Sequence, residues 1–261
     1  MQIAIIGAGN MGGAIARGLS KGKLIQSKNI RVSDVNQKNL DALKAFAPEI
    51  LVSNSNREII KDANIILLAV KPWLVETIAE EFENKFDYKK QIVVSIAAGV
   101  DFDQLTRFFN TDATIFRVIP NTAIDVQQSV STIASFNANK EQEQLVVDIF
   151  AELGKTFLVP ESQLNAFMSL SSCGIAYAFR YIRAATEGGV EMGIYPNTAK
   201  EVVIQTLRGA IDLLEANGTH PEVEIDKVTT AGGTTIKGLN EMEANGFTNA
   251  VIKGLKASHI K

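Results

Sequence analysis

The sequence predicts an α/β protein with an N-terminal, mainly parallel, doubly wound sheet and an all-helical C-terminal domain. Short apolar runs alternate with stretches of helical periodicity over the first 160 residues, and no further strand pattern follows Pro160. A glycine-rich turn joins the first apolar run to the first helical stretch. Such alternation gives a parallel sheet with helices on both faces. We therefore predict a sheet domain over residues 1–160 and a helical domain over residues 161–261.

The strands of the first domain are read from apolar runs, because buried parallel strands are apolar on both faces. The run Ile65-Ile66-Leu67-Leu68-Ala69-Val70 is the clearest of them. The predicted strands cover residues 3–6, 30–33, 51–52, 65–70, 92–96, 114–118 and, as the last one, 131–134. Helices are predicted over residues 12–20, 37–46 and 140–153.

The second domain begins with apolar positions at helical spacing over residues 162–192. A helix of that length is too long for a domain of about 100 residues to bury alone. Gly188 and Gly189 lie inside it, and we expect them to permit close helix–helix contact between subunits, with a kink or an earlier helix end as the alternative. Further helices are predicted over residues 197–216 and 234–244, each followed by Asn-Gly.

Composition excludes several classes of protein. A net charge of -3 offers no basic surface for nucleic acid, and no apolar stretch is long enough to span a membrane. No secretory signal pattern precedes the first strand, and the single cysteine suits a reducing compartment, so we expect a cytoplasmic protein. One cysteine and two histidines also make a metal site unexpected.

The turn after the first strand, Gly7-Ala8-Gly9-Asn10-Met11-Gly12, has the spacing G-x-G-x-x-G between a strand and a helix. Gly7 permits the tight turn, Gly9 lets a pyrophosphate approach the backbone, and Gly12 lets the helix lie close to the sheet. The N-terminus of the helix favours an anion. The first domain is therefore predicted to bind a dinucleotide through these six residues.

A segment of the second domain indicates the function more specifically than the glycine-rich turn does. Val228-Thr229-Thr230-Ala231-Gly232-Gly233-Thr234-Thr235-Ile236 resembles the signature of pyrroline-5-carboxylate reductases, which reduce a cyclic imine to L-proline with NAD(P)H in the last step of proline biosynthesis. Shorter matches occur in the same order along nearly the whole chain: Gly9-Asn10-Met11-Gly12, Ala69-Val70-Lys71-Pro72, Pro120-Asn121-Thr122 and Gly246-Phe247. The family usually has a proline where this chain has Ala231, and another where it has Ile175.

The resemblance implies a site for a small imine that carries a carboxylate. Gly232, Gly233 and Thr234 would bind the carboxylate at the start of a helix. Thr235 would be the catalytic residue, its hydroxyl meeting the imine nitrogen. The alternative for Gly232, Gly233 and Thr234 is an ordinary glycine turn with a threonine cap. The alternative for Thr235 is a structural residue in the first turn of the helix. Hydride transfer to an imine needs positioning more than acid–base groups, so the lack of a histidine relay is no objection.

The remaining cofactor residues are implied by the resemblance and by their place after strands. Asn56 would lie near the adenosine, or be a surface loop residue. Asn121 would lie near the nicotinamide, although a turn-forming role would explain it equally well. Lys71 could contact cofactor or substrate, or be a solvated loop lysine. The other predicted contacts are Ala69, Val70, Pro72, Ala97, Ala98 and Gly99.

Asp34, at the end of the second strand, bears on the choice of cofactor. An acidic side chain there binds the ribose hydroxyls of NAD. Relatives that prefer NADPH often carry an arginine nearby, whereas this chain reads Asp34-Val35-Asn36, so we expect NADH to be slightly favoured over NADPH. Lys38 is a possible phosphate partner against this, and Asp34 could instead only cap the next helix.

Two other functions remain open. A hydroxy-acid dehydrogenase also joins a nucleotide-binding half to a helical half, but needs a lysine on a helix of the second half, for which Lys237 comes nearest. A non-catalytic dinucleotide sensor is the third possibility, given the altered Ile175 and Ala231. The family resemblance further implies a homodimer through the C-terminal helices, with a larger ring of dimers as an extension.

Overall fold

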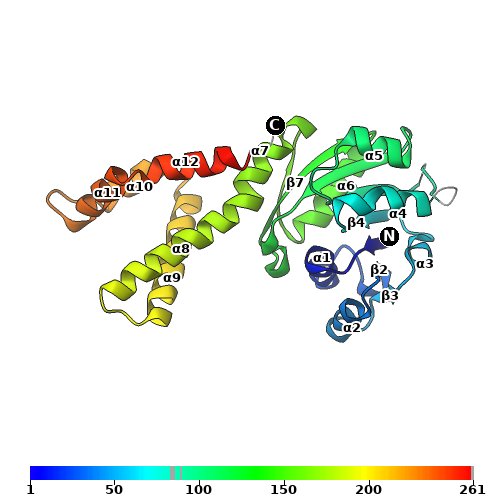
Figure 1. The fold of residues 1–261 in the computed structure, drawn as a ribbon, viewed down its shortest axis with the longest axis horizontal. Coiled ribbons are helices and arrows are strands. Elements are labelled where there is room, and N and C mark those ends of the chain that lie inside the picture. Colours follow the sequence, from blue (N-terminus) through cyan, green and yellow to red (C-terminus); the bar gives the residue numbers. More distant parts are fainter. Residues whose placement is uncertain (83–85, 89, 260–261) are drawn as a thin grey trace. The chain divides into compact units, whose positions relative to one another are not determined.

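The computed structural model describes residues 1–82, 86–88 and 90–259. The chain divides into two compact units, Met1–Ser172 and Cys173–Lys261. The first unit contains the sheet and the second contains only helices among its described residues (Figure 1). The domain boundary predicted after residue 160 lies slightly before this division. The residues between the two positions form a short helical segment that packs with the first unit.

The first unit is built on one eight-stranded sheet in the described residues, in the order β3-β2-β1-β4-β5-β6-β7-β8. All neighbouring strands are parallel except β6 and β7, which are antiparallel. The mainly parallel sheet is thus confirmed. The strands are β1 Ile3–Ile6, β2 Ile30–Ser33, β3 Leu51–Ser53, β4 Ile65–Leu68, β5 Ile92–Ser95, β6 Thr114–Ile119, β7 Ser129–Phe136 and β8 Gly154–Leu158.

Helices cover both faces of this sheet, because alternate strand residues point to opposite sides. Ile3 and Ile5 belong to one buried cluster, which is covered by α1 Asn10–Ser20, α2 Gln37–Phe46 and α6 Lys140–Ala151. Ala4 and Ile6 belong to the other, which is covered by α3 Asn56–Ile60, α4 Val75–Glu81, α5 Phe102–Phe109 and α7 Leu164–Met168.

The predicted strands are confirmed, with ends shifted by one or two residues, but the prediction that residues 131–134 form the last strand is wrong. β8 follows α6 and pairs with β7 at the edge of the sheet. Most of its side chains are exposed, so it lacks the continuous apolar run by which buried strands are recognised. Gly154 opens it with a φ of +143°, where an added Cβ atom would overlap the backbone of Ser129.

The helical run predicted over residues 162–192 contains an interruption. α7 passes into a π-helical turn, Ser169–Cys173, before α8 Gly174–Glu191 begins. Within the first unit, the Ser172 hydroxyl donates to the carbonyl oxygen of Pro120 at 3.0 Å, which ties this turn to the loop after β6. A π-helical turn inserts an extra residue into a helix and occurs often at functional sites.

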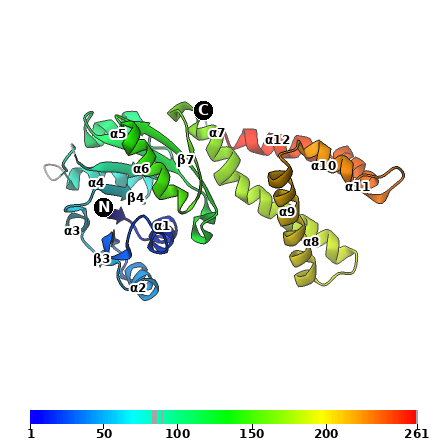
Figure 2. The same cartoon turned by 180° about the vertical axis from the view of Figure 1, so that it is seen from behind.

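The second unit consists of α8, α9 Pro196–Asn217, α10 Pro221–Lys227, α11 Thr234–Ala244 and α12 Phe247–Ala257. α8 and α9 lie side by side in both views (Figure 2). An added Cβ atom at Gly189 would lie 3.0 Å from the Ala199 Cβ atom. The predicted close helix contact is thus present at Gly189, but with α9 of the same chain.

Two helices of the second unit were not predicted, α10 and α12. Both begin at positions that were read as loop or turn: His220-Pro221, where His220 is the N-cap residue of α10, and Gly246, which precedes α12 in the left-handed region. No helix among the described residues is long and apolar enough to cross a lipid bilayer.

Candidate active site

The glycine-rich turn between β1 and α1 has two positions that packing reserves for glycine. Gly7 has a φ of +98°, and an added Cβ atom would lie 2.5 Å from the carbonyl oxygen of Ala69. At Gly12 an added Cβ atom would overlap the carbonyl oxygen of Gly7. These two glycines therefore allow the turn, the helix and the loop after β4 to lie against one another.

Gly9 differs from both, because an added Cβ atom there would meet nothing within 4 Å. Its φ of −67° is open to any residue. Gly9 is also the N-cap of α1 and provides no side chain to cap the helix. The start of α1 thus has no side-chain acceptor and has open space at Gly9, which is the arrangement that suits a pyrophosphate.

A cleft of about 710 Å³ lies beside this turn. It occurs where the sheet order reverses, between β1 and β4, at the ends of the strands where ligands of doubly wound sheets bind. The cleft brings together most of the predicted cofactor residues: Gly7, Gly9, Asn10, Met11, Asp34, Asn56, Ala69, Val70, Lys71, Pro72, Ala97 and Ala98. The group that the turn and cleft fit is a dinucleotide.

The predicted cofactor residues outside the cleft lining are Ala8, Gly12, Gly99 and Asn121. Ala8 contributes its N–H group to Asp34, and Gly99 follows β5 with a φ of +81°. Asn121 is buried, and its side-chain oxygen accepts from the N–H group of Ala123 while its Nδ2 donates to Ser171. The Asn121 side chain is therefore hydrogen-bonded to its own turn and to the π-helical turn Ser169–Cys173.

Asp34 lies at the cleft edge after β2. Its Oδ2 accepts from the Ala8 N–H group at 2.7 Å, and its Oδ1 accepts from the Asn36 N–H group at 2.7 Å. The N-cap of α2 is Asn36, whose side chain accepts from the N–H group of Lys38. Asp34 thus joins the glycine-rich turn to the β2–α2 turn and does not cap α2.

The opposite wall of the cleft contains residues that the sequence had not indicated. Leu74, Thr77, Ile78 and Glu81 line it from α4 and the short helix before α4, η2 Pro72–Leu74. Asn56, at the start of α3, donates from its Nδ2 to a Glu81 oxygen at 3.0 Å. These four positions have the spacing of one helix face, and this spacing is the feature of the sequence from which they could have been predicted to lie together.

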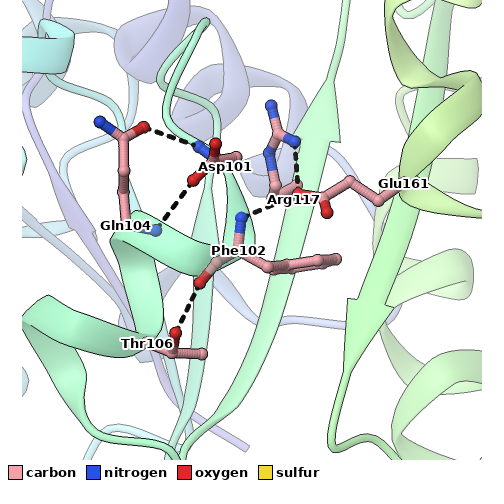
Figure 3. A network of polar contacts seen from close by, with 6 residues as sticks. All are labelled: Asp101, Phe102, Gln104, Thr106, Arg117 and Glu161. Carbon is pink, nitrogen blue, oxygen red and sulfur yellow. Dashed lines mark hydrogen bonds and ion pairs between the residues drawn. The ribbon is translucent and has the colours of Figure 1, made fainter.

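A second polar network joins three elements of the first unit, as Figure 3 shows. Arg117 of β6 is almost completely buried and pairs with Glu161 at 2.6 Å. The same Glu161 oxygen accepts from the N–H group of Phe102 at 2.8 Å, at the start of α5. Asp101 and Gln104 cap that helix reciprocally. This network holds the strand that leads to Pro120 and was missed in the sequence.

The predicted substrate residues lie together at the start of α11 in the second unit. Gly233 is the N-cap of α11 and provides no capping side chain, and Gly232 has a φ of +70°. Thr234 and Thr235 are the first residues of the helix and are exposed. This loop therefore offers an uncapped helix N-terminus, as the turn before α1 does. No cluster of three or more metal-ligating side chains occurs in the described part of the chain.

The comparisons with known proteins agree along the whole chain. Residues 161–261 match the family model described as pyrroline-5-carboxylate reductase dimerisation, and residues 2–99 match the model described as NADP oxidoreductase coenzyme F420-dependent. The pyrroline-5-carboxylate reductase of Methanosarcina acetivorans is 35% identical over 98% of this chain and 96% of its own length.

Two further relatives extend the comparison. Pyrroline-5-carboxylate reductase 1 of Dictyostelium discoideum is 34% identical over 99% of this chain, which spans about half (49%) of that longer protein. The crystal structure of Plasmodium falciparum pyrroline carboxylate reductase with NADP bound has a TM-score of 0.89 at 25% identity, and covers 99% of this chain and 95% of that one. This chain belongs to the pyrroline-5-carboxylate reductase family.

Proposed function

We propose that this chain reduces L-1-pyrroline-5-carboxylate to L-proline, with the dinucleotide in the cleft beside α1 and the substrate carboxylate at the start of α11. The observations that carry the proposal are the glycine N-caps of α1 in the first unit and of α11, within the segment that resembles the family signature, in the second; neither provides a capping side chain. Each suits one of the two anionic groups that the reaction brings together, a pyrophosphate and a carboxylate.

The proposed reaction requires little acid–base catalysis by side chains of the protein. The bound reduced nicotinamide supplies the hydride that the imine carbon accepts. Gly232, Gly233 and Thr234 hold the substrate carboxylate through N–H groups, and the Thr235 hydroxyl forms a hydrogen bond with the ring nitrogen. A threonine hydroxyl is a poor proton source, so the imine binds in its protonated form and Thr235 orients it.

The carboxylate of Asp34 favours NADH over NADPH in this proposal. It lies at the cleft edge beside Val35, whose side chain is 96% exposed. A 2′-phosphate placed there would meet a negative charge and no arginine, whereas ribose hydroxyls can donate to the carboxylate. Lys38 in the first turn of α2 is the nearest candidate in sequence for a compensating cation.

The second unit supports a homodimer through its helices. Only Gly189 and Ala199 are buried among its described residues, although it contains many large apolar side chains. Apolar surface of this extent is typical of an obligate interface. Its exposed apolar residues include Phe179, Met192, Tyr195, Val202, Ile211, Leu213, Val223, Val228, Phe247 and Ile252. A larger ring of such dimers and a cytoplasmic location complete the proposal.

The test is the loss of reduced-nicotinamide absorbance with L-1-pyrroline-5-carboxylate, measured separately with NADH and NADPH. We expect turnover with both and a higher kcat/KM with NADH. Turnover with neither cofactor, in protein that still binds them, would contradict the reductase assignment. A preference for NADPH would contradict only the role of Asp34. Light scattering of the same sample gives the oligomeric state, and a monomer would contradict the homodimer.

A further inference from the structure

The α4 wall of the cleft carries an acidic side chain that the proposed function does not use. Glu81 is the last residue of α4 and is half-buried. It lines the cleft together with Thr77 and Ile78, which share its face of the helix. Asp34 lines the same cleft, so its lining contains two carboxylates, and only that of Asp34 has a role in the proposed function.

Hydrogen bonds hold Glu81 in a defined position. The Ser33 hydroxyl donates to Asn56 Oδ1 at 2.7 Å, and Asn56 Nδ2 donates to Glu81 Oε2 at 3.0 Å. An ionised carboxylate only accepts, so the Asn56 amide must turn its nitrogen toward Glu81. The Oε1 atom of Glu81 has no donor within the described residues, which leaves a fixed acceptor in the cleft wall.

The order of groups along a dinucleotide indicates what reaches this acceptor. The pyrophosphate lies at the start of α1 and the adjoining ribose at Asp34 in the proposed function, on which this step rests. The base then follows, at the part of the cleft lined by Val35, Asn56 and Glu81. The cleft lining also contains the apolar side chains of Leu74 and Ile78, which suit the flat faces of a purine.

We infer that Glu81 accepts a hydrogen bond from the 6-amino group of the adenine ring and thereby selects adenine over 6-oxo purines. An amino group donates, whereas a 6-oxo group would bring a second acceptor against the carboxylate. The acceptor is preorganised by Asn56 and Ser33, so little is lost in ordering it on binding. Glu81 is therefore a specificity-determining residue of the cofactor site.

Trp73 provides a binding readout that does not depend on turnover. It is the only tryptophan of the chain, and its side chain is 73% exposed. Pro72 and Leu74 on either side of it both line the cleft. Energy transfer from Trp73 to bound reduced nicotinamide gives a Kd for NADH and for reduced nicotinamide hypoxanthine dinucleotide, which differs from NADH in having a 6-oxo group in place of the 6-amino group.

The experiment compares the ratio of these two Kd values in four proteins. We expect the unaltered chain to bind NADH roughly ten-fold more tightly, as for the loss of one hydrogen bond to a charged group. Glu81→Gln keeps the side-chain volume and Glu81→Ala removes the acceptor, and both should bring the ratio close to one. Glu80→Ala is the matched control, because Glu80 is exposed and lies outside the cleft lining.

The outcomes separate this inference from the proposed function. Loss of the preference in either Glu81 variant, with Glu80→Ala unchanged, supports it. A preference that persists in both variants, or no preference in the unaltered chain, overturns it and leaves the cofactor cleft in place. Failure of the unaltered chain to bind either dinucleotide overturns the proposed cleft itself.

Discussion

The substitution Gly9→Ala tests how much the open space before α1 contributes to cofactor binding, separately from protein stability. In the protein without cofactor the added Cβ atom meets nothing, and alanine adopts the same backbone angles. Loss of a glycine N-cap costs about 1 kcal/mol, while the lower entropy of the unfolded chain returns about 0.4–1 kcal/mol. The free energy of unfolding should therefore change little.

The same methyl group would occupy the space that a pyrophosphate needs at the helix N-terminus. Overpacking of this kind costs about 1–3 kcal/mol, so the Kd for NADH should rise roughly ten-fold or more. Calorimetric titration measures the Kd, and thermal unfolding without cofactor measures stability. Unchanged NADH affinity in Gly9→Ala would refute the assignment of this position to the pyrophosphate.

Two other glycines serve as matched controls. Gly12→Ala should impair folding, because its Cβ atom would overlap the carbonyl oxygen of Gly7. Gly209→Ala, inside α9, meets nothing within 4 Å and should stabilise the helix by about 1 kcal/mol without any change in NADH affinity. The three variants together separate backbone packing, helix propensity and ligand space.

Three further predictions concern catalysis, cofactor choice and pH. Thr235→Ala should lower kcat sharply and leave the Kd for NADH unchanged, with Thr235→Ser as the rescue; equal rates in steady-state assays would remove Thr235 from the mechanism. Asp34→Ser with Val35→Arg should shift the kcat/KM ratio toward NADPH, and a constant ratio would contradict the role of Asp34. Hydrogen bonds from Lys227 and Thr219 hold the pKa of Glu224 below its usual range. This carboxylate therefore stabilises the fold above its ordinary pKa and ceases to do so as the pH falls through the lowered value, so Glu224→Gln should lower the Tm at neutral pH but not in acid.

The sheet was predictable because its central strands are buried on both faces and read as apolar runs. Ile65–Leu68 is such a strand, whereas the edge strand Gly154–Leu158 is mostly exposed and was missed. The same reasoning explains α10: His220 accepts a hydrogen bond from the N–H group of Glu222, a capping role that histidine seldom has in sequence patterns. Local propensity did not distinguish these cases from loops.

The residues of the candidate site likewise fall into those that local sequence predicts and those that depend on contacts between distant parts of the chain. The glycine-rich turn was predictable because its spacing reports a backbone requirement, which the φ of Gly7 and the close approach at Gly12 bear out. Glu81 was not, because its place depends on the partnership with Asn56, 25 residues earlier, and on how α4 packs. Arg117 and Glu161 lie 44 residues apart and meet only in the folded unit.

The N-termini of the helices connect stability with function in this chain. α2, α5 and α6 are capped by the side chains of Asn36, Asp101 and Asn139. α1 and α11 begin after Gly9 and Gly233, which leave the first N–H groups without a side-chain acceptor. A serine at Gly9 would fit sterically and supply that acceptor, stabilising the protein without cofactor by a few tenths of a kcal/mol. It would also compete with the pyrophosphate for the same N–H groups, so a more stable apoprotein should bind NADH more weakly. Nothing in the fold requires glycine at this position, whereas the proposed pyrophosphate site does.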